Sequence, residues 1–260
     1  MLQNKDAYQL PDVASDYAKR TELQPSEATI LSMLLPILGT ARMLDMGVGG
    51  GRTSLHFSKI VREYVGADYS SSMIDECRRR FAGCAESVSF QVCDARNMEM
   101  FATDSFDFIL FSHNGIDSVG HEDRLKVLKE VQRVGKSGGY FAFSTHNLNW
   151  ARGLFDWSRI ISMNPKHIVK TAKRLVMRFF YNWNVSAKTI RNSPHAIFND
   201  GAHRRKLEHY YIRPLEQIEQ LKEGFSDVRV FSHGDGAEIK DLSHLKAVED
   251  PWLYYLCKIN

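Results

Sequence analysis

The sequence is poor in features that mark disulfides, membrane spans or secretion. The 260 residues include only four cysteines, and none belongs to a C-x-x-C pair (Cys77, Cys84, Cys93 and Cys257). Scattered cysteines of this kind predict reduced thiols in a cytoplasmic protein. No apolar run is long enough to span a bilayer, and the first ten residues lack the apolar stretch of a signal peptide. With 43% hydrophobic and 25% charged residues, the composition is that of an ordinary globular protein with a substantial core.

Signatures of several enzyme classes are absent as well. The ten histidines include no H-E-x-x-H pattern, and no G-x-S-x-G elbow of a hydrolase occurs. We therefore expect no metal ion and no hydrolase chemistry. A P-loop is disfavoured too, because it needs a lysine where this chain has Arg52 after its main glycine cluster.

A glycine-rich turn dominates what the sequence does contain. Residues 41–54 read ARMLDMGVGGGRTS, which is a short apolar run, four glycines within five residues and the start of a helical pattern. Strand, glycine turn and helix form the first unit of a doubly wound fold, where such sheets bind nucleotides. Glycine allows the backbone to turn tightly and a ligand to approach it closely. Arg52 also breaks the G-x-G-x-x-G spacing of a dinucleotide site.

The spacing Gly47-x-Gly49-x-Gly51, with Asp45 two residues ahead, resembles motif I of the class I S-adenosylmethionine-dependent methyltransferases. The resemblance implies S-adenosyl-L-methionine as cofactor and S-adenosyl-L-homocysteine as product. A carboxylate at position 45 suits the cationic amino group of a methionine moiety and would repel a pyrophosphate. We expect Asp45 and these three glycines to contact the cofactor.

Two further carboxylates end the next two predicted strands. Asp68 lies about 20 residues beyond the glycine turn, where an acid can accept hydrogen bonds from both ribose hydroxyls. It could instead cap the following helix, and by itself it would not exclude NAD. In the family that the chain resembles, an acid at the position of Asp94 accepts a hydrogen bond from the adenine amino group. The predicted cofactor site is completed by residues beside these acids and after strand four, namely Tyr69, Cys93, Ala95 and Ser112.

The fourth and fifth predicted strands end in polar residues that the resemblance places near the reacting methyl group. Histidine titrates in the range that suits a general base, so His113 and His146 are the candidate catalytic residues, with His121 and His209 behind them. Each could equally be a structural or substrate-orienting histidine. The candidates for binding the substrate are Asn114, Asp117, Asn147 and Tyr211.

The resemblance is dense over residues 41–147 and returns at 215–258. It implies an α/β fold with a doubly wound, mostly parallel sheet of seven strands, ordered 3-2-1-4-5-7-6, with the last strand antiparallel. We expect an N-terminal helical lid at 1–40, from which Tyr17 and Arg20 could reach the cofactor, a cofactor-binding core at 41–147, and the end of the core sheet at 215–260.

Residues 148–214 remain, and they are expected to form a helical insertion between strands five and six. From residue 151 to 213 the chain has thirteen basic and three acidic residues, a net charge of +10, which leaves −7 for the remainder. Residues 165–181 have an amphipathic helical pattern, with aromatic residues nearby. The segment could be a lid or dimer helix, a cover over an anionic small substrate, a peripheral membrane contact through residues 165–183, or an RNA-binding surface, for which no known module is present.

Together these features predict a methyltransferase that moves a methyl group to an oxygen or nitrogen of a small metabolite, anionic or linked to a lipid or saccharide. The transfer would be an in-line displacement without metal. The rival hypotheses are an RNA-directed methyltransferase, an NAD(P)-dependent oxidoreductase and a non-catalytic scaffold that binds the cofactor. The identity of the acceptor, and whether the chain is a dimer, cannot be predicted from the sequence.

Overall fold

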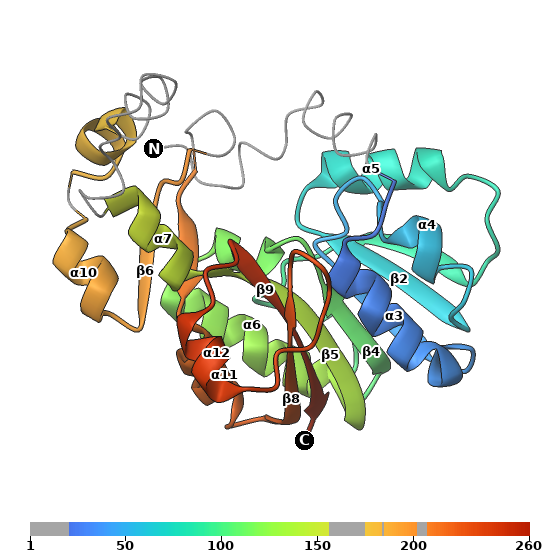
Figure 1. The fold of residues 1–260 in the computed structure, drawn as a ribbon. Helices are drawn as coiled ribbons and strands as arrows, with labels where there is room; N and C mark the ends of the chain where they lie inside the picture. Colours follow the sequence, from blue (N-terminus) through green and yellow to red (C-terminus); the bar gives the residue numbers. More distant parts are fainter. Residues whose placement is uncertain (1–20, 156–174, 184, 202–206) are drawn as a thin grey trace.

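The computed structural model describes residues 21–155, 175–183, 185–201 and 207–260, which form a twisted sheet with helices on both faces (Figure 1). The first five strands follow the buried apolar runs of the sequence: β1 (Arg42–Met46), β2 (Glu63–Asp68), β3 (Val88–Val92), β4 (Phe106–Phe111) and β5 (Gly135–Asn147). They lie parallel in the order β3-β2-β1-β4-β5. Chain order reverses between β1 and β4, and it is beside such a switch point that open α/β sheets bind ligands.

The last two strands of the core are β8 (Phe225–Ser232) and β9 (Trp252–Ile259). β9 pairs antiparallel with β5 along residues 140–146, and β8 pairs antiparallel with β9. The core order is therefore β3-β2-β1-β4-β5-β9-β8, which confirms the predicted fold and the order of its seven core strands. Over the described residues the whole sheet has nine strands rather than the seven predicted.

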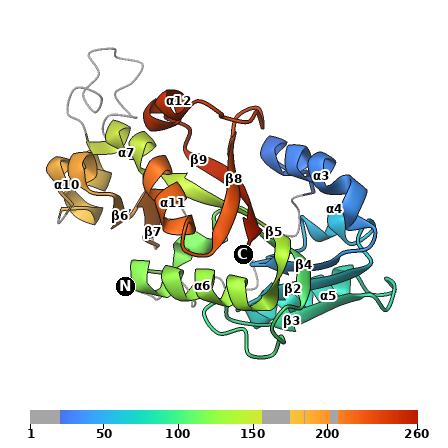
Figure 2. The same ribbon diagram turned by 90° about the horizontal axis from the view of Figure 1, so that it is seen from below.

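The helices bury their apolar stripes against the two faces of this sheet (Figure 2). One face is covered by α3 (Pro25–Leu38), α4 (Ser54–Phe57) and α5 (Ser71–Arg80). The other is covered by α6 (His121–Val134), α11 (Pro214–Leu221) and α12 (Leu242–Ala247). Helix α3 lies within the segment 1–40 that was expected to be helical, while Tyr17 and Arg20 of the expected lid lie outside the described residues.

The expected insertion is not purely helical. Its described parts are α7 (Leu148–Phe155), a π-helical turn η3 (Met177–Tyr181), α10 (Ala187–Asn192) and a two-stranded antiparallel ribbon of β6 (His195–Phe198) and β7 (His209–Ile212). β7 joins the sheet by pairing with the end of β5, where His146 is opposite Tyr211. The sequence did not predict these two strands, which are only four residues long each. Most of the predicted helix at 165–181 lies outside the described residues.

Within the described part of the chain, no helix is both long and apolar enough to cross a membrane. A short 3₁₀ helix, η1 (Gly115–Ser118), connects β4 to α6. This helix contains Asp117, which lies beside His146.

Candidate functional site

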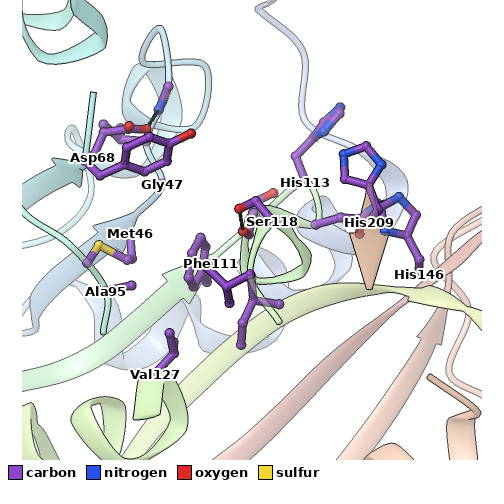
Figure 3. A pocket seen from close by; sticks show the side chains of 18 of the residues that line it. Met46, Gly47, Asp68, Ala95, Phe111, His113, Ser118, Val127, His146 and His209 are labelled. Carbon is purple, nitrogen blue, oxygen red and sulfur yellow. Dashed lines mark hydrogen bonds between the residues drawn. The ribbon is translucent and has the colours of Figure 1, made fainter. Parts of the chain in front are cut away.

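A cavity of about 630 Å³ opens at the carboxyl ends of the parallel strands. Figure 3 shows its two ends: Met46, Gly47, Asp68 and Ala95 lie at one, and His113, His146 and His209 lie at the other. Phe111 and Ser118 lie between them. The size is typical of a pocket for a small molecule or cofactor.

The glycine turn after β1 forms one wall of the cavity. Gly47 and Gly49 line it, and both have positive φ, 66° and 54°. A Cβ on Gly47 would lie 2.6 Å from Cε2 of Phe111. Gly51, at φ 79°, does not line the cavity, because it faces the ring of Phe81, 2.6 Å from where its Cβ would be. The third glycine therefore serves packing, which corrects the expectation that it contacts the cofactor.

Asp45 also departs from its expected role. Its side chain is buried behind the turn and does not line the cavity. Thr53 Oγ1 and Tyr64 OH each donate a hydrogen bond of 2.5 Å to Asp45 Oδ2. Burial raises the pKa of Asp45 to about 6 in spite of these two donors. Asp45 fixes the glycine turn to α4 and β2, so any effect on a bound ligand is indirect.

Asp68 lies where the sequence predicted, at the end of β2 and on the cavity wall. Its Oδ2 accepts a hydrogen bond of 3.0 Å from the backbone N–H of Gly49, and its Oδ1 accepts one of 2.9 Å from that of Ser70. Helix α5 is capped by Ser70, not by Asp68. Burial raises the pKa of Asp68 to about 6. Each carboxylate oxygen keeps a lone pair for a ligand hydroxyl.

The residues expected around an adenine ring also line this end of the cavity: Tyr69, Cys93, Asp94 and Ala95. Asp94 is held by Arg96, whose Nη2 donates a hydrogen bond of 2.7 Å to Asp94 Oδ2. Arg96 reaches Asp123 as well, at 2.7 Å. Asp94 therefore lines the cavity as predicted, and its carboxylate is already paired with the guanidinium of Arg96.

A buried network that the sequence did not predict connects helix α3 to the glycine turn. The guanidinium of Arg52 donates to both carboxylate oxygens of Glu27, at 2.5 and 2.6 Å, and to Ser112 Oγ at 3.1 Å. Tyr254 OH donates to Glu27 Oε1 at 2.7 Å. Although burial opposes ionisation, the Arg52 contacts hold the pKa of Glu27 below its usual value. Arg52 and Ser112 both line the cavity.

Both predicted catalytic histidines lie in the cavity wall at its other end. His146 is the last residue but one of β5, and Asn114 Nδ2 lies 3.1 Å from its Nε2. Asp117 Oδ2 lies 2.8 Å from His146 Nδ1, at an angle that is poor for a hydrogen bond. The ring of His146 therefore faces Asn114 with Nε2 and the Asp117 carboxylate with Nδ1.

Two predicted substrate contacts, Asp117 and Asn147, do not line the cavity. Asp117 forms a fully buried ion pair of 2.6 Å with Arg124 and accepts hydrogen bonds from Thr145 Oγ1 and the His146 backbone, each at 2.7 Å. Asn147 Nδ2 donates to the carbonyl of Val248 at 2.9 Å. Both residues lie behind the cavity wall and support it. Residues next to them in the sequence line the cavity instead.

The ribbon of the insertion completes this end of the cavity. Tyr211, as predicted, and His209 line it, and both reach Asp200: Tyr211 OH donates to Asp200 Oδ2 at 2.8 Å, and His209 Nδ1 lies 3.0 Å from the same oxygen. The rings of His146 and Tyr211 stack with centroids 4.7 Å apart. Trp150, Asp200 and Trp252 also line the cavity, and no motif pointed to them.

His121, the other reserve candidate, is outside the cavity, where its Nδ1 lies 2.8 Å from Tyr210 OH. The described residues contain no cluster of three or more metal-ligating side chains.

Known methyltransferases resemble the part of this chain that holds the glycine turn and the first parallel strands. Residues 43–139 match the family model described as "Methyltransferase domain". The chain is 34% identical over 105 residues to a ubiquinone/menaquinone biosynthesis C-methyltransferase of Desulfotalea psychrophila, and 37% identical over 108 residues to an uncharacterized methyltransferase of Bacillus subtilis. These matches cover 39% and 40% of both partners, so the chain spans about two fifths of the length of each relative.

Solved structures extend the similarity to the whole fold. An S-adenosylmethionine-dependent methyltransferase of Mesorhizobium loti superposes with a TM-score of 0.59 at 17% identity, over 90% of this chain and 97% of the other. The 1,6-didemethyltoxoflavin-N1-methyltransferase of Burkholderia thailandensis superposes with a TM-score of 0.59 at 14% identity, over 100% and 91%. At these identities the similarity is one of fold.

Proposed function

We propose that this chain transfers a methyl group from S-adenosylmethionine to a small-molecule acceptor, because residues 43–139 match the model of a methyltransferase domain. The observation that carries the proposal is that one cavity joins the glycine turn and Asp68 to a group of three histidines. A cofactor site and a site for proton transfer then share one enclosed space.

The residues present fit the proposed cofactor. Gly47 and Gly49 leave the backbone open to close approach, and Asp68 offers acceptor lone pairs to a ribose. Tyr69, Cys93 and Ala95 give the neighbouring wall a largely apolar surface for an adenine ring. When bound there, S-adenosylmethionine supplies an electrophilic methyl group.

At the other end, His146 is the general base of this proposal. Asp117 faces its Nδ1, and Nε2 can take a proton from an acceptor hydroxyl or nitrogen that replaces Asn114 Nδ2 beside it. Arg124 fixes Asp117 from the opposite side. His113 lies at the same end of the cavity as His146, with its ring centroid 6.2 Å from that of Trp252, and is assigned to holding the acceptor.

A carbon acceptor is the second candidate, because the Desulfotalea psychrophila relative is named a C-methyltransferase. Removing a proton from a phenol-type hydroxyl activates ring carbon as well as oxygen. The proposed base therefore serves either outcome, and the carbon NMR shift of the transferred methyl group in the product would distinguish an ether from a carbon-linked methyl group.

The experiment that tests the proposal is calorimetric titration with S-adenosylhomocysteine. We expect micromolar-range binding to the unmodified chain, and loss of binding in Asp68→Ala and in Gly49→Leu. Glu86→Ala, at an exposed position away from the cavity, is the control. Binding that is unchanged in both site variants would refute the cofactor site, and binding of NADH in place of the nucleoside would favour the oxidoreductase.

A further inference from the structure

Three charged side chains, Asp94, Arg96 and Asp123, gather at the end of the cavity that Asp68 and Ala95 mark in Figure 3. Asp94 and Arg96 follow β3, and Asp123 lies in the first turn of α6. All three line the cavity, with side chains between 31% and 41% exposed. The cluster is therefore open to a ligand, and its chemistry decides which part of a nucleoside it can recognise.

The order of the strands places this cluster next to the base of a bound nucleoside. Asp68 ends β2, and β3 pairs with β2 so that Val92 lies opposite Asp68. The segment that follows Val92 thus leaves the sheet one strand beyond the carboxylate proposed for the ribose. Neighbouring strands are about 4.8 Å apart, so a base attached to that ribose extends over this segment and brings its edge to the cluster.

Arg96 occupies most of the carboxylate of Asp94. Asp94 Oδ1 accepts hydrogen bonds from the backbone N–H of Arg96 at 2.9 Å and from its Nε at 3.0 Å. Asp94 Oδ2 accepts a hydrogen bond from Arg96 Nη2 at 2.7 Å. Since a carboxylate has about four lone-pair sites, these donors of a single residue leave little room for a donor from a ligand.

The second carboxylate of the cluster is paired as well. Asp123 Oδ2 accepts a hydrogen bond from Arg96 Nη1 at 2.7 Å, and Asp123 Oδ1 accepts one from Lys126 Nζ at 2.9 Å. The charges of the two carboxylates are thus balanced by two cations. Arg96 lies between the carboxylates and is held by both.

Arg96 still has donors for a ligand. Its Nε, Nη1 and Nη2 each donate to a carboxylate, but Nη1 and Nη2 each carry a second N–H group. These two N–H groups have no hydrogen-bond partner within the part of the chain that the structure describes. Towards the edge of a base, the cluster therefore presents donors rather than acceptors.

Purines differ in what they need from such a cluster. Adenine presents an amino group at C6, which donates, whereas hypoxanthine presents a carbonyl oxygen there, which accepts. A carboxylate without a partner would accept from the amino group and reject the carbonyl oxygen, because two acceptors would then face each other. A guanidinium can donate to the carbonyl oxygen, so pairing with Arg96 removes the reason for that rejection.

We propose that Arg96 sets the base specificity of the cofactor site: by occupying Asp94 and presenting its remaining N–H groups, it lets the site bind a purine with an oxygen at C6 nearly as well as adenine. This rests on the proposed function and specifies its cofactor site. It departs from the role that the resemblance implies for Asp94, which is to accept a hydrogen bond from the adenine amino group.

The test compares S-adenosylhomocysteine with S-inosylhomocysteine, in which hypoxanthine replaces adenine. Each is titrated by calorimetry into the full chain. A carboxylate that accepted from the amino group would favour the adenosyl compound by about tenfold or more. We expect the two dissociation constants to differ by less than about fivefold, because the Asp94 carboxylate is already occupied.

Variants assign the effect to Arg96. Arg96→Met removes the guanidinium and frees Asp94 for the amino group, so the preference for the adenosyl compound should rise by at least about fivefold. Asp123→Asn leaves the contacts between Arg96 and Asp94 in place and should keep the preference of the unmodified chain. Arg79→Met, at an exposed arginine of α5 that pairs with Glu76 outside the cavity, is the matched control. Circular dichroism verifies that each variant is folded.

Two outcomes would overturn the inference: a preference for the adenosyl compound of about fivefold or more in the unmodified chain, or a preference that does not rise in folded Arg96→Met. In both, S-adenosylhomocysteine still binds, so the proposed function stands. If neither compound binds, the proposed function fails, and this inference fails with it. The comparison in the unmodified chain needs no variant, so it decides the matter even where Arg96→Met does not fold.

Discussion

Nδ1 of His146 lies 2.8 Å from Oδ2 of Asp117, and the two residues reach this distance from different elements, the end of β5 and the turn η1. The same carboxylate is fully buried and paired with Arg124. This contact is the reason that His146, and not His113, is proposed as the general base.

The first prediction concerns that base. His146→Gln keeps the size and polarity of the side chain but removes the titrating nitrogen, so we expect methyl transfer to fall by about 10²–10⁴-fold. The affinity for S-adenosylhomocysteine should stay the same, because His146 lies at the other end of the cavity. His113→Gln, the matched control, should raise KM for the acceptor more than it lowers kcat. Equal losses of kcat in the two variants would contradict the assignment of His146 as the base.

The second prediction is a pH dependence of cofactor binding. Burial raises the pKa of Asp68 to about 6 from its ordinary 3.8, so the carboxylate form that accepts ligand hydroxyls is lost as the pH falls through 6. Affinity for S-adenosylhomocysteine should decline by up to about tenfold per pH unit below that point. In Asp68→Asn the remaining weak binding should lose most of this dependence, whereas Asp75→Asn, on the exposed side of α5, should retain it.

The same shift has a consequence for stability, with the opposite sign. The folded state holds the Asp68 proton up to about pH 6 and the unfolded chain only to about 3.8, so this group favours folding at low pH and ceases to do so as the pH rises through 6. Urea unfolding between pH 4 and 7 should show a smaller fall in the free energy of unfolding for Asp68→Asn than for the unmodified chain.

The third prediction tests the buried ion pair behind the base. Arg124→Met leaves the charge of Asp117 buried without its partner, which should lower the free energy of unfolding by about 3–5 kcal/mol. Removing the acid as well, in Asp117→Ala with Arg124→Met, should recover part of that loss. Lys222→Ala, which breaks an exposed pair with Glu219, should change stability little. Chemical denaturation measures all three, and a single variant as stable as the unmodified chain would show the pair to be dispensable.

The fourth prediction separates backbone strain from steric clash in the glycine turn. In Gly47→Ala the residue keeps φ near 66° and its Cβ lies 2.6 Å from the Phe111 ring, so both stability and cofactor affinity should fall. Adding Phe111→Leu relieves the clash but leaves the left-handed backbone, which costs about 1–2 kcal/mol. Gly39→Ala, with nothing within 4 Å and a negative φ, is the control. Full recovery in the double variant would show that strain is unimportant here.

Residues that are close in sequence were predicted well. The pattern of glycines after an apolar run indicated strand, turn and helix, and Asp68 and Asp94 were placed at strand ends because parallel strands finish at one edge of a sheet. The direction of a side chain was harder to predict. Asp45 and Gly51 belong to the motif, but the pleat of β1 and the packing of Phe81 turn them away from the cavity.

Contacts between distant segments could not be derived from any motif. Glu27 meets Arg52 across 25 positions of the chain, and the insertion brings Asp200 and His209 to the cavity only because β7 pairs with the end of β5. The basic residues of the insertion suggested an anionic acceptor, and that stays a prediction because most of these residues lie outside the described parts of the chain.

The sequence by itself therefore determined the doubly wound sheet and the end of it that receives a cofactor, because these depend on local pattern and on the common direction of parallel strands. Only the tertiary structure decided which polar groups face the cavity and which face each other. That choice depends on strand pairing and burial, through which Asp117 became the partner of His146 and Arg124 rather than a contact for the acceptor.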